Sequence, residues 1–120
     1  MALPRELRLR HRRDFDAVFR SGRAYHNDLL VLRSLPNRMS HNRFGFVTSK
    51  RLGKAVVRNR VRRRLQEAVR QLPLRPGCDV VVSAKAAAAQ AGYQSLRQGL
   101  VDLLARAGLL LPNQESEISP

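Results

Sequence analysis

The sequence predicts a single-domain α+β fold. The chain has 120 residues and a hydrophobic content of 43%, which is enough for one modest core but not for two independent ones. Short apolar runs at 29–32, 43–48 and 79–83 have the length of strands, whereas 57–69 and 96–104 repeat apolar residues at helical spacing. With a short helix near the start, the order is helix, two or three strands, helix, strand, helix. This order is typical of helices packed on one sheet.

A basic arm and a short helix begin the chain. Residues 1–12 are rich in arginine and weakly patterned. Asp14 is predicted to be the N-cap of the helix, which ends at Ser21 and Gly22 because glycine commonly closes helices. The apolar face of this helix carries Phe15, Val18 and Phe19.

The strands follow from composition and turn signals. One strand is predicted over Tyr25–Leu35, ended by a turn at Pro36 and Asn37. The segment Arg43–Thr48 has aromatic residues at alternate positions, and it is predicted to pair with the first strand as a hairpin. The run 79–83 is almost continuously apolar, as central strands are.

A strongly basic helix is predicted between the last two of these strands. It ends before Pro73, whose ring cannot continue the hydrogen-bond ladder. Its apolar residues fall within about 120° of arc and are expected to face the core, with Arg58 and Arg64 at the borders of that stripe. The stripe consists of Val57, Val61, Leu65, Ala68 and Val69. The outward side of the helix consists of Asn59, Arg60, Arg62, Arg63 and Arg70.

The last predicted helix carries Leu96, Leu100, Leu103 and Leu104 on one face and ends at Gly108. The domain is expected to comprise residues 1–110, and residues 111–120 are expected to be a flexible tail because they are largely polar. If the strands on either side of the basic helix are parallel, that helix is a crossover connection. The sequence leaves their relative direction open.

Positive charge is concentrated in the first part of the chain. Residues 1–70 hold 19 Lys and Arg against 5 Asp and Glu, whereas residues 71–120 hold 4 of each, so the whole net charge of +14 lies in the first part. Residues 50–70 alone contain 9 basic residues and a single acid, Glu67. This density on a folded helix indicates a surface that binds a polyanion.

The sequence does not have the features of a membrane protein or of a secreted protein. No apolar run approaches the roughly 20 residues of a membrane span, and the arginine-rich N-terminus lacks the apolar region of a signal peptide. We therefore expect a cytoplasmic protein. The lone Cys78 is predicted to be a small buried hydrophobe.

The sequence contains no recognisable catalytic or metal-binding pattern. Its histidines are isolated, and no pair of carboxylates has acid–base spacing. Gly53 and Lys54 lack the upstream glycine and the following Ser or Thr of a phosphate-binding loop. The acids Asp14, Asp16 and Asp28 are expected to cap a helix or form turns.

Two segments resemble a known family. The run SKRLGKAVVRNRVRRR at 49–64 and the run DFDAVFRSG at 14–22 are similar to the signature and first helix of the bacterial ribonuclease P protein subunit. The resemblance extends from about Arg10 to Leu104. It implies an α/β sandwich of the ribosomal protein S5 domain 2-like type. Such a fold has a mixed four-stranded sheet, three helices and a left-handed βαβ crossover, contrary to the usual right-handed preference.

The resemblance also implies a function. Such a protein is a cofactor of ribonuclease P: it binds the catalytic RNA and the 5′ leader of precursor tRNA, and the RNA with its Mg²⁺ ions removes the leader. The protein is then expected to carry no catalytic residue, no metal and no cofactor of its own. One protein is expected per RNA.

Specific residues match the family's binding positions. Arg58, Asn59 and Arg60 match its Arg-Asn-Arg motif, which contacts the RNA subunit. Phe15 and Phe19 match positions that line a cleft for the unpaired leader, where bases can stack on aromatic rings. Arg33 stands where related sequences often carry an aromatic residue, and it is assigned to the same cleft. The rest of the expected RNA-subunit surface is Lys50, Arg51, Lys54, Arg62 and Arg63.

Alternative interpretations remain open. A Phe pair spaced i, i+4 is often plain core. The whole chain fits a general RNA-binding or ribosomal protein with no role in cleavage, which would not select one structured RNA. A stand-alone nuclease and a membrane-surface helix fit less well, because the first lacks catalytic residues and the second needs the apolar stripe that the core uses.

Overall fold

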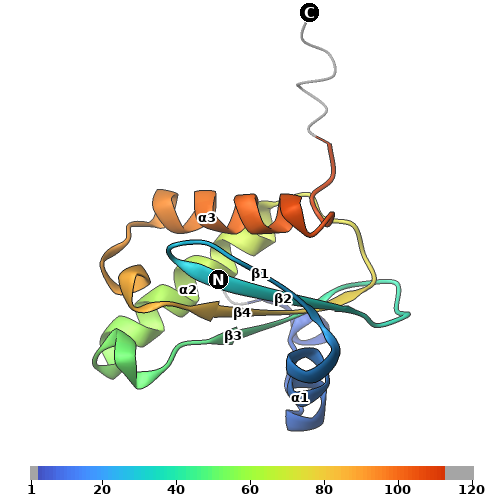
Figure 1. Cartoon of the computed structure of the whole chain (residues 1–120), viewed down its shortest axis with the longest axis horizontal. Coiled ribbons are helices and arrows are strands. Elements are labelled where there is room, and N and C mark those ends of the chain that lie inside the picture. Colours follow the sequence, from blue (N-terminus) through green and yellow to red (C-terminus); the bar gives the residue numbers. More distant parts are fainter. Residues whose placement is uncertain (1–2, 113–120) are drawn as a thin grey trace, which may run out of the picture.

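The computed structural model describes residues 3–112 and shows one domain built around a four-stranded sheet (Figure 1). The helices of this part of the chain are α1 (Arg12–Ser21), α2 (Ala55–Gln71) and α3 (Tyr93–Arg106); the strands are β1 (Arg23–His26), β2 (Leu30–Pro36), β3 (Arg43–Val47) and β4 (Cys78–Ala84); and the 3-10 helices are η1 (Arg5–Leu7), η2 (Lys50–Leu52) and η3 (Ala86–Gln90). α1 packs on one face of the sheet, and α2 and α3 cover the other (Figure 1).

The strand order is β1-β2-β4-β3, so the predicted hairpin between Tyr25–Leu35 and Arg43–Thr48 is wrong: β4 lies between β2 and β3. β2 pairs antiparallel with both β1 and β4, and β3 pairs parallel with β4. The reason lies in β4, because the backbone around the buried Val80, Val81 and Val82 has no access to water, so its N–H and C=O groups need a neighbouring strand at each edge. α2 therefore connects two parallel neighbours as a crossover, whose handedness stays a prediction of the resemblance.

The segment predicted as one strand over Tyr25–Leu35 is two strands. The side-chain oxygen of Asn27 accepts hydrogen bonds from the backbone N–H groups of Leu29 and Leu30, at 3.1 and 3.0 Å. This is a turn of the kind that asparagine stabilises locally. Asp28 lies within that turn, as expected, and β1 becomes the sheet edge beside β2.

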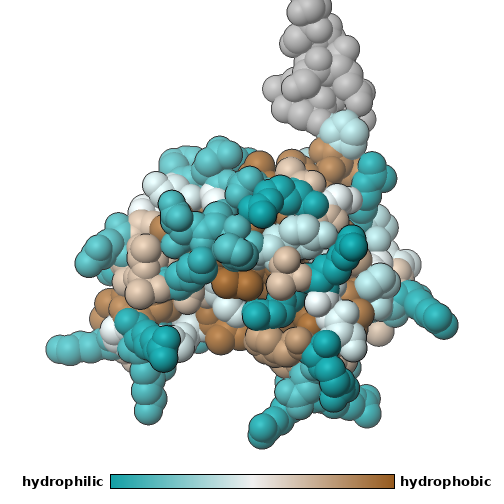
Figure 2. All heavy atoms as spheres, viewed as in Figure 1, coloured by the Kyte–Doolittle hydropathy of each residue, from teal (hydrophilic) through white to brown (hydrophobic). Residues whose placement is uncertain are grey.

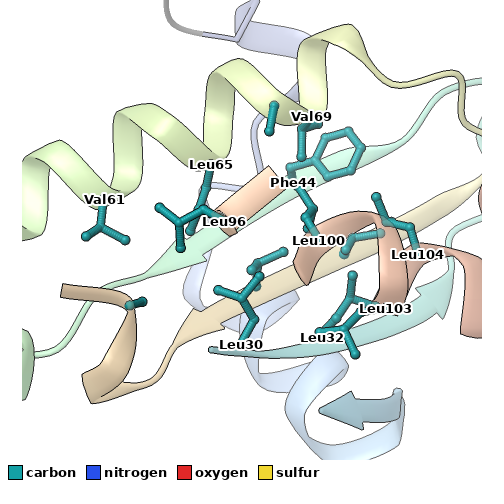
Figure 3. Close-up of a cluster of buried hydrophobic side chains, with 14 of the residues drawn as sticks. Leu30, Leu32, Phe44, Val61, Leu65, Val69, Leu96, Leu100, Leu103 and Leu104 are labelled. Carbon is teal, nitrogen blue, oxygen red and sulfur yellow. The ribbon is translucent and has the colours of Figure 1, made fainter. Parts of the chain in front are cut away.

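The main core lies between the sheet and helices α2 and α3 (Figure 3). Four of the five predicted stripe residues of α2 are buried, whereas Val57 near the start of the helix is only half-buried. The four leucines predicted for α3 are all fully buried, and Gly108 closes that helix at φ +76°. The core side chains labelled in Figure 3 are Leu30, Leu32, Phe44, Val61, Leu65, Val69, Leu96, Leu100, Leu103 and Leu104.

The N-terminal arm contains buried residues and the 3-10 helix η1, which its weak pattern did not indicate. α1 begins at Arg12, with His11 at the N-cap position, so Asp14 lies in the first turn and is not the cap. Ahead of it, Leu3 and Leu9 are buried, and the Leu9 N–H donates to the Phe44 carbonyl at 2.8 Å. The arm is thus held along the free edge of β3.

Near the end of the described residues, the Leu111 N–H donates to the carbonyl of Pro73 at 2.9 Å. Residues 113–120 of the predicted tail lie outside the described residues.

Cys78 is a free thiol at the start of β4 and is half-buried against the core. Burial, with a smaller effect from the charge of Asp79, raises the pKa of this thiol above its ordinary value. It is therefore less completely buried than predicted but keeps the character of an inert, apolar side chain.

Candidate nucleic-acid interface

A cluster of exposed polar and basic side chains surrounds the start of α2. It includes η2, Lys54 and the first half of the helix, as far as Arg63, where the apolar stripe leaves one side free for solvent. Figure 2 shows hydrophilic side chains projecting at the η2 end of the molecule and around α1, with more apolar surface between them. The exposed members of the predicted RNA-subunit surface are Lys50, Arg51, Lys54, Asn59 and Arg63.

The other arginines of α2 are partly occupied by the fold. Arg60, predicted to point outward, is half-buried and donates to the carbonyl of Ala89 at 3.2 Å. Arg64 donates to the carbonyl of Ala91 at 2.9 Å, so both side chains connect α2 to η3 and the residue after it. Arg60 turns toward η3 because η3 packs beside α2 and its free carbonyl groups need donors.

Arg62 lies on the opposite side of α2 from these two arginines. It donates to the Thr48 hydroxyl at 2.5 Å and to the side-chain oxygen of Asn59 at 3.0 Å. The fork of Arg62 is therefore held in place beside the end of β3. By contrast, the Nε atoms of Arg58 and Arg60 are buried and have no hydrogen-bond partner among the described residues.

We expect Arg64→Ala to lower the free energy of unfolding by about 1–2 kcal/mol, because a charge-assisted hydrogen bond to a half-buried carbonyl is lost. Arg63, one residue away, is exposed. Arg63→Ala removes the same charge and should change the free energy of unfolding by less than about 0.5 kcal/mol. Urea unfolding of both variants measures the difference. Equal values would contradict a structural role for Arg64.

The structure brings two of the three predicted cleft residues into direct contact. The guanidinium of Arg33 on β2 lies over the ring of Phe19 on α1, with 4.9 Å between its Cζ and the ring centroid. This is a cation–π arrangement. Phe19 remains 44% exposed, so it is not plain core. The pair leaves an aromatic edge and a positive charge side by side at the surface.

Phe15 lies one turn earlier on α1 and packs on β3 at Gly45. A Cβ atom at position 45 would overlap the Cε1 and Cζ atoms of the Phe15 ring, so glycine permits this contact. Gly45, Val81 and Arg33 form one row across the sheet, directly beneath α1. Phe15 therefore lies above Gly45 and Phe19 beside Arg33, two positions of the same row.

Gly45→Ala is expected to displace the Phe15 ring and to destabilise the fold by about 1–3 kcal/mol through overpacking. Gly99→Ala serves as the control, because a Cβ there has its nearest neighbour at 3.6 Å. Thermal unfolding of the two variants provides the comparison. A Gly45→Ala protein as stable as the wild type would contradict the close packing.

A hollow of about 200 Å³ opens beside Phe15 at the free edge of β3. It lies where the N-terminal arm, α1, β3 and α2 approach one another, between the Phe15–Phe19 face and the basic face of α2. Its outer residues combine exposed arginines of the arm with a half-buried amide and an aromatic ring. The lining residues are Arg8, Leu9, Arg10, Phe15, Phe44, Gly45, Phe46, Arg62 and Gln66.

A buried ion pair beneath α1 was missed by the sequence analysis. Asp79 is 6% exposed and accepts hydrogen bonds from Arg43 Nε at 2.9 Å and Arg43 Nη2 at 2.7 Å. The same Arg43 lies 3.5 Å from the carboxylate of Asp14 on α1, and Asn37 donates to Asp79 at 2.9 Å. The available signal was an acid at the start of an apolar strand, which requires a buried partner.

The hydrogen bonds to Asp79, partly opposed by burial, raise the pKa of Arg43 above its ordinary value. The guanidinium therefore stays charged under all ordinary conditions. Within residues 3–112, no group of three or more His, Cys, Asp and Glu side chains is arranged to hold a metal ion. No helix in the same residues is long and apolar enough to cross a membrane.

Residues 3–108 match the family model of ribonuclease P. The chain belongs to the ribonuclease P protein component family. The ribonuclease P protein component of Roseiflexus sp. (strain RS-1) is 43% identical over 111 residues, covering 90% of this chain and 91% of that protein. That of Clostridium botulinum (strain Langeland / NCTC 10281 / Type F) is 36% identical over 108 residues, covering 88% of this chain and 97% of that protein.

Solved structures of ribonuclease P proteins have the same fold. The protein from Thermotoga maritima matches with a TM-score of 0.74 and 32% identity, over 82% of this chain and 96% of that one. The Staphylococcus aureus protein matches with a TM-score of 0.80 and 26% identity, over 88% of this chain and 98% of that one. The predicted family and the predicted three-helix, mixed four-stranded fold are thereby confirmed.

Proposed function

We propose that this chain is the protein cofactor of a bacterial ribonuclease P. It binds the catalytic RNA subunit through the start of α2 and the 5′ leader of precursor tRNA beside α1, and so assists removal of the leader. The observation that carries the proposal is the Arg-Asn-Arg segment at 58–60, in a member of this family, at the start of a helix whose surrounding basic side chains face solvent.

The exposed cations suit the backbone of a folded RNA. Lys50, Arg51, Lys54 and Arg63 have no hydrogen bond or ion pair from their side chains within residues 3–112, so they are available to phosphate oxygens. Asn59 can both donate and accept hydrogen bonds at a ribose or base edge.

The α1 side suits an unpaired strand. Phe19 is exposed at its edge, Arg33 adds a charge, and the hollow beside Phe15 connects this face to the basic face of α2. Stacking on an aromatic side chain is worth roughly 1–3 kcal/mol per base. Arg33 in place of an aromatic residue favours a phosphate contact or guanidinium stacking at that position.

In this proposal the protein performs no bond chemistry. Mg²⁺ ions held by the RNA subunit supply the catalysis, one protein acts with one RNA, and the complex works in the cytoplasm. The protein's cations replace part of the screening that magnesium would otherwise provide, since they lie against the same phosphates.

The deciding experiment measures leader removal from a precursor tRNA at low Mg²⁺, with the chain alone, a bacterial ribonuclease P RNA alone, and both together. We expect efficient cleavage only in the mixture. Cleavage by the chain alone would mean that it is itself a nuclease. A mixture no faster than the RNA alone would favour a general RNA-binding protein.

Phe19→Ala is expected to reduce the preference for precursor over mature tRNA by roughly 5- to 100-fold, because one stacking contact with the leader is lost. The affinity of the holoenzyme for mature tRNA should stay unchanged. Affinities of the holoenzyme for the two tRNAs measure this ratio. An equal loss for both would contradict a leader contact at Phe19.

A further inference from the structure

The orientation of α1 rests on few contacts. Val18 is its one fully buried residue among those described. It packs with Leu9 and Val81 in a cluster apart from the main core, and the partly buried Phe15, Leu35 and Val47 pack against these three. A ten-residue helix held by so small a cluster has little apolar area to fix its angle against the sheet. A second attachment between α1 and the sheet would add to the packing that holds Phe15 and Phe19 in place.

The second attachment is the chain of charged groups from Asp79 through Arg43 to Asp14. Arg43 and Asp79 are direct partners in the register of β3 and β4, so the guanidinium is fixed by two adjacent strands. Its remaining nitrogen, Nη1, faces Asp14 in the first turn of α1 at 3.5 Å. Side-chain exposures are 8% for Asp79, 19% for Arg43 and 22% for Asp14, so water screens these contacts only in part.

We infer that Asp14 and Arg43 are positioning residues for the leader site: they fix the first turn of α1 against the sheet and so set the place of Phe15, the next residue, and of Phe19. This rests on the proposed function for its consequence, but the contact itself belongs to the free protein. Asp14 and Arg43 would thus act in precursor recognition through their contact with each other.

Asp16 offers a matched control on the same helix. It carries the same charge two residues away, is 57% exposed, and lies 3.9 Å from Arg12, whose side chain is 95% exposed. Such an exposed pair contributes little to structure. Asp14→Ala and Asp16→Ala therefore change the net charge equally and differ in whether a contact with the sheet is lost.

A general effect of charge and a loss of the α1 contact lead to different results for Asp14→Ala. Removing an acid from a protein that binds a polyanion should strengthen RNA binding by long-range electrostatics, and this applies to both variants. If Asp14 positions α1, Asp14→Ala should instead lose about five- to tenfold in preference for precursor over mature tRNA. Asp16→Ala should keep the wild-type ratio, and Asp14→Glu, which retains the charge, should restore most of it.

A second measurement is independent of the proposed function. Hydrogen exchange in the free protein should be several-fold faster for the α1 amides in Asp14→Ala than in Asp16→Ala, with the β4 amides unchanged in both. Equal α1 exchange in the two variants would overturn the inference even if the precursor ratio changed. Faster α1 exchange, in a chain whose wild type shows no precursor preference, would uphold the positioning contact and reject the proposed function alone.

Discussion

Asp79→Ala should destabilise the protein by about 3–5 kcal/mol, since it leaves the Arg43 guanidinium in a mostly buried site without its main partner. The loss includes both hydrogen bonds from Arg43 and the one from Asn37, whose side chain also orders the loop after β2. Urea unfolding followed by circular dichroism measures it. For a domain of this size, such a change is a large part of the total stability.

The double variant Arg43→Met with Asp79→Leu separates the ion pair from simple packing. Replacing both charges by apolar groups of similar size removes the unpaired charge, so the double variant should recover most of the stability lost by Asp79→Ala. Its α1 amides should still exchange faster than in the wild type, because Asp14 has lost its partner. A double variant as unstable as the single one would contradict the view that an uncompensated charge causes the loss.

Reversing two charges at the start of α2, by Lys54→Glu with Arg63→Glu, should weaken binding to the ribonuclease P RNA by about 100-fold at 0.15 M salt. Both side chains are exposed and are not used by the fold, so the structure should be unaffected. The slope of the logarithm of the binding constant against the logarithm of salt concentration should become less steep by about 2, since at least two phosphate contacts are lost. Filter binding at several salt concentrations measures both quantities.

Arg75→Glu with Arg97→Glu is the control with the same change of net charge. Arg75 follows the far end of α2, and Arg97 lies on α3, away from the Arg-Asn-Arg segment. This variant should lose much less affinity and keep nearly the wild-type salt slope. Equal effects of the two double variants would mean that total charge, and not the surface at the start of α2, governs RNA binding.

The local features of the fold were predictable because they depend on neighbours in the sequence. The apolar stripe of α2, the four leucines of α3 and the apolar run of β4 each show which side of an element is buried, since periodicity follows directly from helix and strand geometry. The basic segment 50–64 and its Arg-Asn-Arg motif were equally visible, because charge density and a family signature need no tertiary information.

The pairing of distant segments was decided only by the tertiary structure. Periodicity shows that a strand has two sides but not which strands lie beside it, so the place of β4 between β2 and β3 was missed.

For the same reason the sequence could not show that Arg60 and Arg64 contact residues 29 and 27 positions away. Nor could it show that Arg43 joins Asp14 and Asp79 across separations of 29 and 36 residues. The sequence by itself determined which residues are buried or charged. The three-dimensional packing decided which arginines the fold uses and which remain for RNA, because hydrogen bonds over these separations exist only once the sheet has formed.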